Sequence, residues 1–245
     1  MKGNAERFHD LHRDGIFVLP NAWDLGSARI LQQLGFEAIA TTSSGFAWTL
    51  GRRDTQVPLE EVLEHYSMMS SALDIPVNAD FEGGYAVDAD RVALNVGAAC
   101  ETGIAGLSIE DSVKDAEKGL YEFDLAVDRV RAARAAIDAS RTGVLLVGRS
   151  EGFIAGRPDL RETIRRLTAF SEAGADCLYA PGVKSRDDIK AIVNAVAPKP
   201  VNVLVSSGFT TVAELGALGV RRISVGGALA RTGWAAVVAA AKEIA

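Results

Sequence analysis

Two segments of this 245-residue chain run from apolar residues directly into acids. One ends at Asp80, with Glu82 close behind it, and the other ends at Glu110 and Asp111. An ionised group taken out of water is costly unless it is paired or bound to a metal, so buried strands with such ends need a counter-charge. A single acidic strand end could simply cap a helix. Two such ends side by side predict a site for a hard divalent cation, Mg²⁺ or alternatively Mn²⁺.

Further polar side chains follow other predicted strands. Residues 41–45 form a hydroxyl- and glycine-rich turn whose N–H groups could hold an oxyanion, although alone they favour a plain loop. Arg149 carries the forked guanidinium that binds carboxylate or phosphate, although an arginine flanked by acids can be only an ion pair. Asp54 could reach over the site or form a surface salt bridge. The set suits an oxyanion-rich substrate whose developing enolate is stabilised by a cation.

The elements that must position these residues alternate along the chain. Apolar, β-branched runs are separated by helical segments, which indicates βα units and a parallel sheet. We predict eight strands, at residues 16–20, 38–42, 76–80, 106–110, 144–149, 177–180, 201–205 and 222–225. We predict eight helices, at residues 25–34, 59–73, 89–101, 125–139, 160–172, 186–196, 212–218 and 229–244.

This alternation predicts an α/β fold with one domain, a (β/α)₈ TIM barrel spanning residues 1–245. The connections 42–58 and 111–124 follow strands and are long, so they would lie at the C-terminal face where barrel active sites are built. Glycines that suit the left-handed position after a helix follow four of the predicted helices, at Gly35, Gly103, Gly174 and Gly219.

Composition limits the classes of function. The formal net charge of -6 argues against a nucleic-acid partner, which needs a basic face. No apolar run reaches the roughly 20 residues of a membrane span, and residues 1–15 lack the apolar core of a signal peptide. We therefore expect a cytoplasmic protein without a membrane partner. The two cysteines lack the spacing of a zinc or redox motif, and the three histidines lie away from the strand ends, so a zinc hydrolase is not expected.

Taken together, these residues resemble the isocitrate lyase/phosphoenolpyruvate mutase superfamily. The resemblance covers nearly the whole chain and depends on the order and spacing of five segments, at residues 20–29, 41–54, 78–85, 106–111 and 148–151. It implies a (β/α)₈ barrel that binds Mg²⁺ and a 2-oxo acid or related carboxylate, with chemistry through an enolpyruvate-like species.

The resemblance also implies roles for single residues. Asp80 and Glu110 match the metal-associated acids, directly or through water. Asp54 matches an acid near the reaction centre and Arg149 a substrate-binding arginine, so Asp54, Glu110 and Arg149 are the expected catalytic residues. The expected substrate contacts are Trp23, Thr42, Ser43, Ser44, Arg149 and Asn202.

The chain departs from the superfamily pattern in two places. Its loop at residues 112–121 lacks the Lys-[Lys/Arg]-Cys-Gly-His motif of the isocitrate and methylisocitrate lyases, and it lacks the Lys-Thr-Asn-Ser run of the phosphonate-forming mutases. These differences argue against cleavage of isocitrate-type substrates and against P–C bond chemistry. Asn78 stands where the superfamily has the first acid of Asp-x-Asp, which removes one charge from the predicted metal site.

We therefore expect a Mg²⁺-dependent lyase that cleaves a C–C bond of a small 2-oxo or 2-hydroxy dicarboxylate, resembling oxaloacetate or malate, through an enolate. One alternative is a phosphoenolpyruvate mutase, carboxyphosphonoenolpyruvate mutase or phosphonopyruvate hydrolase. The other is a barrel that binds a 2-oxo acid without turnover. Lys114 and Lys118 bear on this choice, because a lysine that points into the site would let the loop at 111–124 gate chemistry. We also expect a homo-oligomer, a dimer or tetramer, as in the superfamily.

Overall fold

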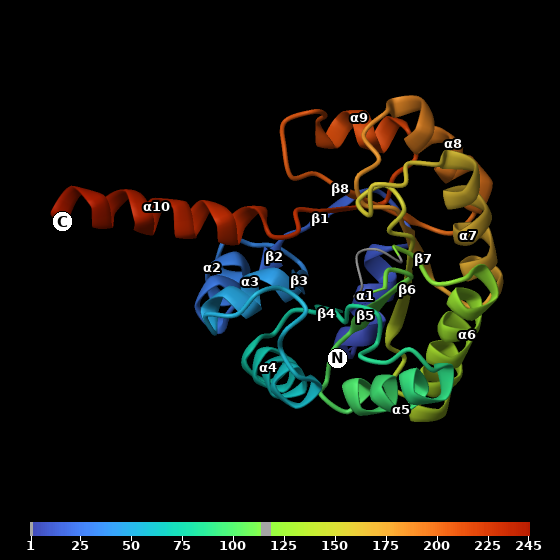
Figure 1. The fold of residues 1–245 in the computed structure, drawn as a ribbon, viewed down its shortest axis with the longest axis horizontal. Helices are drawn as coiled ribbons and strands as arrows, with labels where there is room; N and C mark the ends of the chain where they lie inside the picture. The colour runs from blue at the N-terminus through green and yellow to red at the C-terminus, as the bar shows by residue number, and fades with distance from the viewer. Residues whose placement is uncertain (1, 114–118) are drawn as a thin grey trace.

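A single parallel sheet that closes on itself forms the centre of the protein (Figure 1). The computed structural model describes residues 2–113 and 119–245. Around the sheet the strands follow the order β1-β9-β8-β7-β6-β5-β4-β3-β2. Their bounds are β1 Phe17–Leu19, β2 Asn21–Ala22, β3 Ile39–Thr41, β4 Val77–Asp80, β5 Gly106–Glu110, β6 Leu145–Arg149, β7 Cys177–Tyr179, β8 Val201–Leu204 and β9 Arg222–Ser224.

The predicted (β/α)₈ barrel is confirmed, with one correction to its first strand. That strand is divided at Pro20 into β1, which pairs with β9, and β2, which pairs with β3. Proline has no N–H group for a strand ladder, so the pairing changes partners at this residue. Because β1 and β2 are the two halves of one extended segment, the nine strands occupy eight positions and close the barrel.

Helices surround the sheet, and all eight predicted helices are present. Two further helices were not predicted: α1, which precedes the barrel, and α3, which lies inside the connection 42–58. The bounds are α1 Asn4–Leu11, α2 Leu25–Gln33, α3 Ser43–Thr49, α4 Leu59–Ala72, α5 Ala89–Cys100, α6 Phe123–Ser140, α7 Leu160–Glu172, α8 Arg186–Val196, α9 Val212–Ala217 and α10 Ala228–Ile244.

Helix α1 covers the N-terminal end of the barrel. Phe8 is fully buried and packs with apolar residues of the strands, among them Leu19 and Leu145. Gly106 permits this approach, because a Cβ atom there would lie only 2.6 Å from Cε1 of the Phe8 ring. The helix thus closes the N-terminal end of the barrel and leaves the C-terminal end for a substrate site.

The N-termini of α9 and α8 are capped by side chains. Thr211 and Glu214 form both hydrogen bonds of a capping box, whereas Ser185 accepts a bond from Asp188 N without the reciprocal one. The four glycines predicted to follow helices have the left-handed backbone that the prediction requires, with φ of 89°, 83°, 105° and 92° at Gly35, Gly103, Gly174 and Gly219.

The last helix, α10, extends away from the barrel as a single rod (Figure 1). Its apolar side chains are largely uncovered, with Trp234 40%, Val237 57% and Val238 51% exposed. In the part of the chain that the structure describes, no helix combines the length and the apolar character of a membrane span.

Burial of histidine predicts a pH dependence of stability. Burial lowers the pKa of His65 from 6.5 to about 4, so between these values the unfolded chain binds a proton that the folded chain does not. Stability then falls as the pH drops below about 6.5. We expect His65→Gln to lose less unfolding free energy than wild type between pH 8 and pH 5, by about 2 kcal/mol.

Urea unfolding at the two pH values measures this difference. His9→Gln, on the partly exposed face of α1, is the matched control and should keep the wild-type pH dependence. Equal pH dependence in wild type and His65→Gln would contradict the assignment of His65 as a buried neutral group.

Candidate active site

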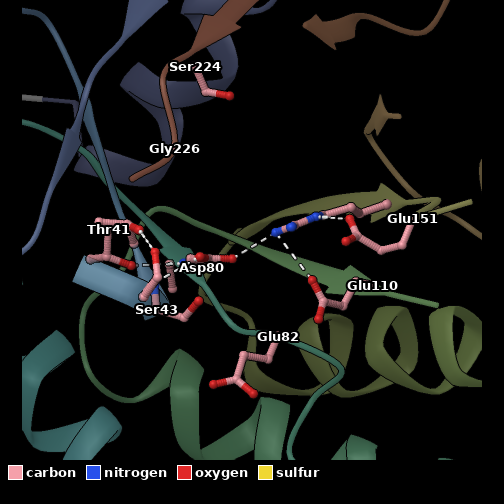
Figure 2. A network of polar contacts seen from close by, with 12 residues as sticks. Thr41, Ser43, Asp80, Glu82, Glu110, Glu151, Ser224 and Gly226 are labelled. Carbon is pink, nitrogen blue, oxygen red and sulfur yellow. Dashed lines mark hydrogen bonds and ion pairs between the residues drawn. The ribbon is translucent and has the colours of Figure 1, made fainter. Parts of the chain in front are cut away.

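Three neighbouring strands bring their C-terminal charges together at one mouth of the barrel (Figure 2). Arg149 Nη1, at the end of β6, lies 2.9 Å from Asp80 Oδ1 at the end of β4 and 3.3 Å from Glu110 Oε2 at the end of β5. The Nε atom of Arg149 also donates to Glu151. The sheet register pairs Glu110 with Arg149 directly. The predicted proximity of Asp80 and Glu110 is thus present in the structure.

Burial makes this cluster strongly interacting. The side chains of Asp80, Glu110 and Arg149 are only 19%, 14% and 17% exposed. Burial disfavours the charge of Arg149, but the carboxylates of Glu151, Glu110 and Asp80 outweigh it and raise the pKa of Arg149 well above its ordinary value. Burial, reinforced by the Asp80 charge, raises the pKa of Glu110 in spite of Arg149. One guanidinium is therefore shared by more carboxylates than it can neutralise.

Asp80 is held in place from several sides. Its second oxygen accepts a hydrogen bond from Ser43 N at 2.9 Å, and its own backbone N–H donates to Thr41 Oγ1 at 2.9 Å. Its backbone carbonyl accepts from the hydroxyl of Tyr66 at 2.7 Å. These contacts fix a carboxylate whose other oxygen faces Arg149 (Figure 2).

The turn at residues 41–45 differs from the expected plain loop. Thr42 is the N-cap of the short helix α3, and Ser43 and Ser44 form its first turn. The Thr42 and Ser44 hydroxyl oxygens lie 3.1 Å apart. All three residues line a cavity with Asp80 and Arg149, so the structure brings the predicted carboxylate-binding residues to the site. One N–H of the turn, that of Ser43, is already used by Asp80.

Asp54 belongs to the same region. It lines the cavity beside Ser43, and neither Arg52 nor Arg53 forms an ion pair with it, since Arg52 pairs with Glu61 at 2.8 Å. Asp54 is exposed at the surface, but desolvation by the surrounding atoms, together with the nearby Asp80 charge, raises its pKa above the ordinary value. The structure therefore favours the interpretation of Asp54 as a site residue over that of a surface salt bridge.

A cavity of about 180 Å³ begins at this cluster and enters the barrel. Its wall contains hydroxyl groups, two glycines next to α10 and three arginines. Its lining residues include Thr41, Thr42, Ser43, Ser44, Asp54, Asn78, Asp80, Ser108, Arg149, Tyr179, Arg222, Ser224, Gly226, Gly227 and Arg231. Its volume suits a substrate of a few heavy atoms. A second cavity of about 710 Å³ lies on the other side of Glu110, lined by Glu82, Glu151 and more apolar side chains.

Two predicted substrate contacts are not brought to this cavity. Trp23 lies beside Gly45 and Gly233, and so packs between α3 and α10 instead. Asn202 is 1% exposed and is used inside the barrel, where its Nδ2 donates to Ser224 Oγ at 2.9 Å. Trp23 follows a strand and Asn202 lies within one, as predicted. The Trp23 side chain packs away from the cavity, whereas Asn202 points into the barrel interior and contacts Ser224 and Arg222 instead of lining the cavity.

Asp111 also differs from its neighbour Glu110. It is 2% exposed and accepts bonds from Glu151 N at 2.8 Å, Ser150 Oγ at 3.2 Å and Arg166 Nη1 at 3.2 Å. Its carboxylate is thus satisfied within the protein and orients the segment that carries Glu151. Arg166 was not considered from sequence, because an arginine on the amphipathic helix α7 looks like a solvated residue.

The base of the predicted gating loop is an antiparallel hairpin. Ser112 forms a bridge with Leu120, Val113 N donates to Gly119 O at 2.9 Å, and Tyr121 N donates to Asp111 O at 2.9 Å. The tip of the loop, with Lys114 and Lys118, lies outside the described residues. The base of the loop, with Ser112, Val113, Gly119 and Tyr121, lines the larger cavity.

The donors at the mouth were tested for their fit to Mg²⁺. Among the described residues, no group of three or more His, Cys, Asp or Glu side chains has the arrangement of a metal centre. Mg²⁺, however, usually takes only one or two carboxylates and completes its shell with water and substrate oxygens. Asp80 and Glu110 supply two such carboxylates, and their excess negative charge is what a divalent cation would relieve. The donor set therefore fits, with Asp80 and Glu110 as the holding residues.

Comparison with known proteins assigns the family. Residues 8–245 match the family model described as phosphoenolpyruvate phosphomutase. The uncharacterised protein Rv1998c of Mycobacterium tuberculosis (strain ATCC 25618 / H37Rv) is 34% identical, over 97% of this chain and 88% of its own length. The oxaloacetate decarboxylase of Paraburkholderia xenovorans (strain LB400) is 32% identical, over 76% of this chain and 63% of its own length.

Solved structures with similar folds support the same family assignment. A candidate lyase/mutase of Burkholderia cenocepacia J2315 has a TM-score of 0.95 at 43% identity, covering 98% of this chain and 88% of that one. A 2,3-dimethylmalate lyase, a member of the PEP mutase/isocitrate lyase superfamily, has a TM-score of 0.90 at 27% identity, covering 100% and 88%. The protein therefore belongs to the phosphoenolpyruvate phosphomutase family within this superfamily, and it is an enzyme.

The charge balance around Arg149 predicts a loss of stability when it is removed. In Arg149→Met, three largely buried carboxylates lose their shared counter-charge, which should cost about 3 kcal/mol of unfolding free energy. Urea unfolding in EDTA measures this cost. Arg165→Met, which removes an exposed ion pair with Glu162, is the control and should cost less than about 1 kcal/mol. Equal losses in the two variants would show that the cluster is not strongly coupled.

Proposed function

We propose that the protein is a Mg²⁺-dependent lyase that cleaves a C–C bond of a small 2-oxo or 2-hydroxy dicarboxylate through an enolate. The observation that carries the proposal is the meeting of Asp80, Glu110 and Arg149 at the mouth of a cavity of about 180 Å³ lined with hydroxyl groups. Similar proteins include an oxaloacetate decarboxylase and a 2,3-dimethylmalate lyase, which supports a short dicarboxylate as the substrate.

Different residues around the cavity would have different roles in such a reaction. The α3 turn, with Thr42, Ser43 and Ser44, presents hydroxyl and N–H donors to one substrate carboxylate. Arg149 provides a fixed positive charge next to the reacting carbons. A bound cation would polarise the substrate carbonyl or hydroxyl oxygen and stabilise negative charge that develops on it.

Proton transfer falls to Asp54 in this scheme. When the C–C bond breaks, its electron pair passes into the enolate of one fragment, and a proton must then be delivered to that carbon. A 2-hydroxy substrate additionally loses its hydroxyl proton as the carbonyl forms. Asp54 lines the cavity and has a raised pKa, so it holds a proton more readily than an ordinary aspartate does.

One observation favours a second candidate function. The matching family model is described as a phosphoenolpyruvate phosphomutase, which keeps mutase or phosphonopyruvate hydrolase chemistry in consideration. ³¹P NMR of the protein with phosphonopyruvate and Mg²⁺ separates the two functions. The lyase proposal requires that the phosphonate signal remain unchanged while oxaloacetate or a substituted malate is cleaved.

Metal dependence tests the proposal directly. Cleavage of oxaloacetate or of a substituted malate should disappear with EDTA and return with Mg²⁺ or Mn²⁺. Asp80→Asn should lower kcat/KM by roughly 100-fold or more, because the substitution removes a charge from the cation and from Arg149.

Circular dichroism should show that Asp80→Asn remains folded. Glu64→Gln, an exposed carboxylate of α4, serves as the charge-matched control and should retain wild-type activity. Full turnover of any of these substrates by the EDTA-treated protein would rule out the metal-dependent mechanism.

We also propose that the protein is a homo-oligomer. Helix α10 extends from the barrel (Figure 1). Its residues Trp234, Val237 and Val238 are exposed, and an exposed apolar face of this kind usually marks an interaction site. Packing of α10 on a second copy of the chain would cover these residues symmetrically.

Size-exclusion chromatography with light scattering tests the oligomer. The double variant Val237→Asp/Val238→Asp should reduce the mass to that of a monomer, because it would bury charges in the contact. Lys242→Glu, at the polar end of the same helix, should keep the wild-type mass. An unchanged mass in the double variant, or a monomeric wild type, would refute the proposal.

A further inference from the structure

A second arginine lies below the charge cluster, inside the barrel. Arg222 is the first residue of β9 and is only 2% exposed. Side chains alternate along a strand, so Arg222 and Ser224 share one face of β9 while Ile223 points to the other. Ile223 belongs to the apolar core around the barrel, which places Arg222 and Ser224 on the interior side. A charged residue in this position requires an explanation.

Among the residues that the structure describes, the hydrogen-bond partners of the Arg222 guanidinium are all neutral. Its Nε donates to Asn202 Oδ1 at 2.9 Å, and its Nη1 lies 3.4 Å from Asn78 Oδ1 and 3.5 Å from His12 Nε2. His12 Nδ1 lies 2.7 Å from the carbonyl oxygen of Phe8 and must donate to it, so Nε2 is the acceptor. Burial, together with the Arg222 charge, lowers the pKa of His12 to about 3, which keeps the ring neutral.

No carboxylate compensates this charge. Within residues 2–113 and 119–245, no Asp or Glu forms an ion pair with Arg222, whereas Arg149 has three such partners. The acidic groups that raise the pKa of Arg222 are Cys177 and Tyr179, which are neutral at pH 7, and burial outweighs them and lowers it. An isolated buried charge is unfavourable unless something pairs with it.

Arg222 also lines the 180 Å³ cavity that opens at the candidate active site. Near it the wall contains the hydroxyl-bearing residues Ser108, Tyr179 and Ser224. Ser224 stands on the β9 side of this space, across from Thr41 and Asp80 (Figure 2). The floor of the cavity therefore combines one uncompensated guanidinium with several possible hydroxyl donors.

We propose that Arg222 forms the centre of an anion subsite at the floor of the barrel cavity and that its ligand is a small carboxylate. A carboxylate matches the charge and the forked shape of the guanidinium, and the hydroxyl groups can donate to its remaining lone pairs. The small cavity limits the ligand to a short acid. Asn78, Asn202 and His12 hold the guanidinium in position without neutralising it.

Two other arginines line the same cavity, and they differ from Arg222. Arg149 is already paired with Asp80, Glu110 and Glu151, so without a divalent cation it has little attraction left for a small anion. Arg231 lies on α10 at the outer edge, where it is exposed to water. An anion bound there would be screened by solvent, and a substitution of Arg231 can distinguish the two positions.

The test measures formate and oxalate binding to EDTA-treated protein by isothermal titration calorimetry, at an ionic strength held constant with a bulky sulfonate salt. Wild type should show one saturable site. Arg222→Met should weaken binding at least about tenfold, since a charge-assisted hydrogen bond is lost. Asn78→Asp should weaken it similarly, because it places a carboxylate about where Asn78 Oδ1 now meets Nη1.

Control variants make the result specific. Arg231→Gln and Arg221→Gln should bind as wild type does, Arg221 being the neighbouring surface arginine that donates to Gly15 O. Circular dichroism checks folding, and if Arg222→Met does not fold, Asn78→Asp still tests the subsite with Arg222 in place. No saturable binding to wild type, unchanged binding in both Arg222→Met and Asn78→Asp, or loss of binding in Arg231→Gln alone would overturn the proposal.

A further titration shows whether the carboxylate at the subsite belongs to the substrate or to a separate acid. Oxalate is titrated in the presence of Mg²⁺, with and without saturating formate. If formate weakens this binding, the subsite receives one end of the same dicarboxylate that reaches the cation. If both bind together, the subsite holds a separate small acid. Each result supports the subsite and leaves the lyase proposal to be judged by the metal-dependence experiment.

Discussion

The arrangement of the barrel mouth depends on the repulsion between carboxylates that three neighbouring structural elements bring together. Asp80, Glu110 and Glu151 all contact the guanidinium of Arg149, and burial prevents water from screening them. One guanidinium cannot keep all three carboxyl groups ionised, since burial raises the pKa of Glu151 to about 8 and also raises the pKa of Glu110. The site is therefore arranged to accept further positive charge, and a divalent cation held by Asp80 and Glu110 is the form of it that also binds an anionic substrate.

The interior of the barrel shows the opposite imbalance. Arg222 is surrounded by the neutral acceptors Asn78, Asn202 and His12, so positive charge is in excess at the floor while negative charge is in excess at the mouth. The cavity of about 180 Å³ connects the two regions. A short acid with a carboxylate at one end and a metal-binding oxygen at the other would relieve both imbalances at once. The charge pattern of the cavity would thus be complementary to such an acid.

Much of this architecture could be predicted from sequence, because local chemistry specifies it. Strands that end in acids and glycines that follow helices each act within a few residues, and the barrel follows from their repetition. The split of the first strand at Pro20 and the helix α3 inside 42–58 were missed, because a strand break and a short helix depend on tertiary pairing. Trp23 and Asn202 were placed on the correct segments, but their direction is set by α10 and by Ser224 and Arg222. Arg222 was not predicted as a site residue, although its alternation with Ile223 could have indicated that it faces the interior.

The most direct test of the account is binding of Mn²⁺ followed by electron paramagnetic resonance, with and without oxalate, in wild type and in Glu110→Gln. The account predicts one Mn²⁺ site per chain that oxalate strengthens, because oxalate supplies oxygen ligands where the two carboxylates leave coordination positions open. Glu110→Gln should weaken that site by about tenfold or more. Failure of wild type to bind Mn²⁺ even with oxalate, or equal affinity in wild type and Glu110→Gln, would contradict the claim that the cluster at the barrel mouth holds a divalent cation.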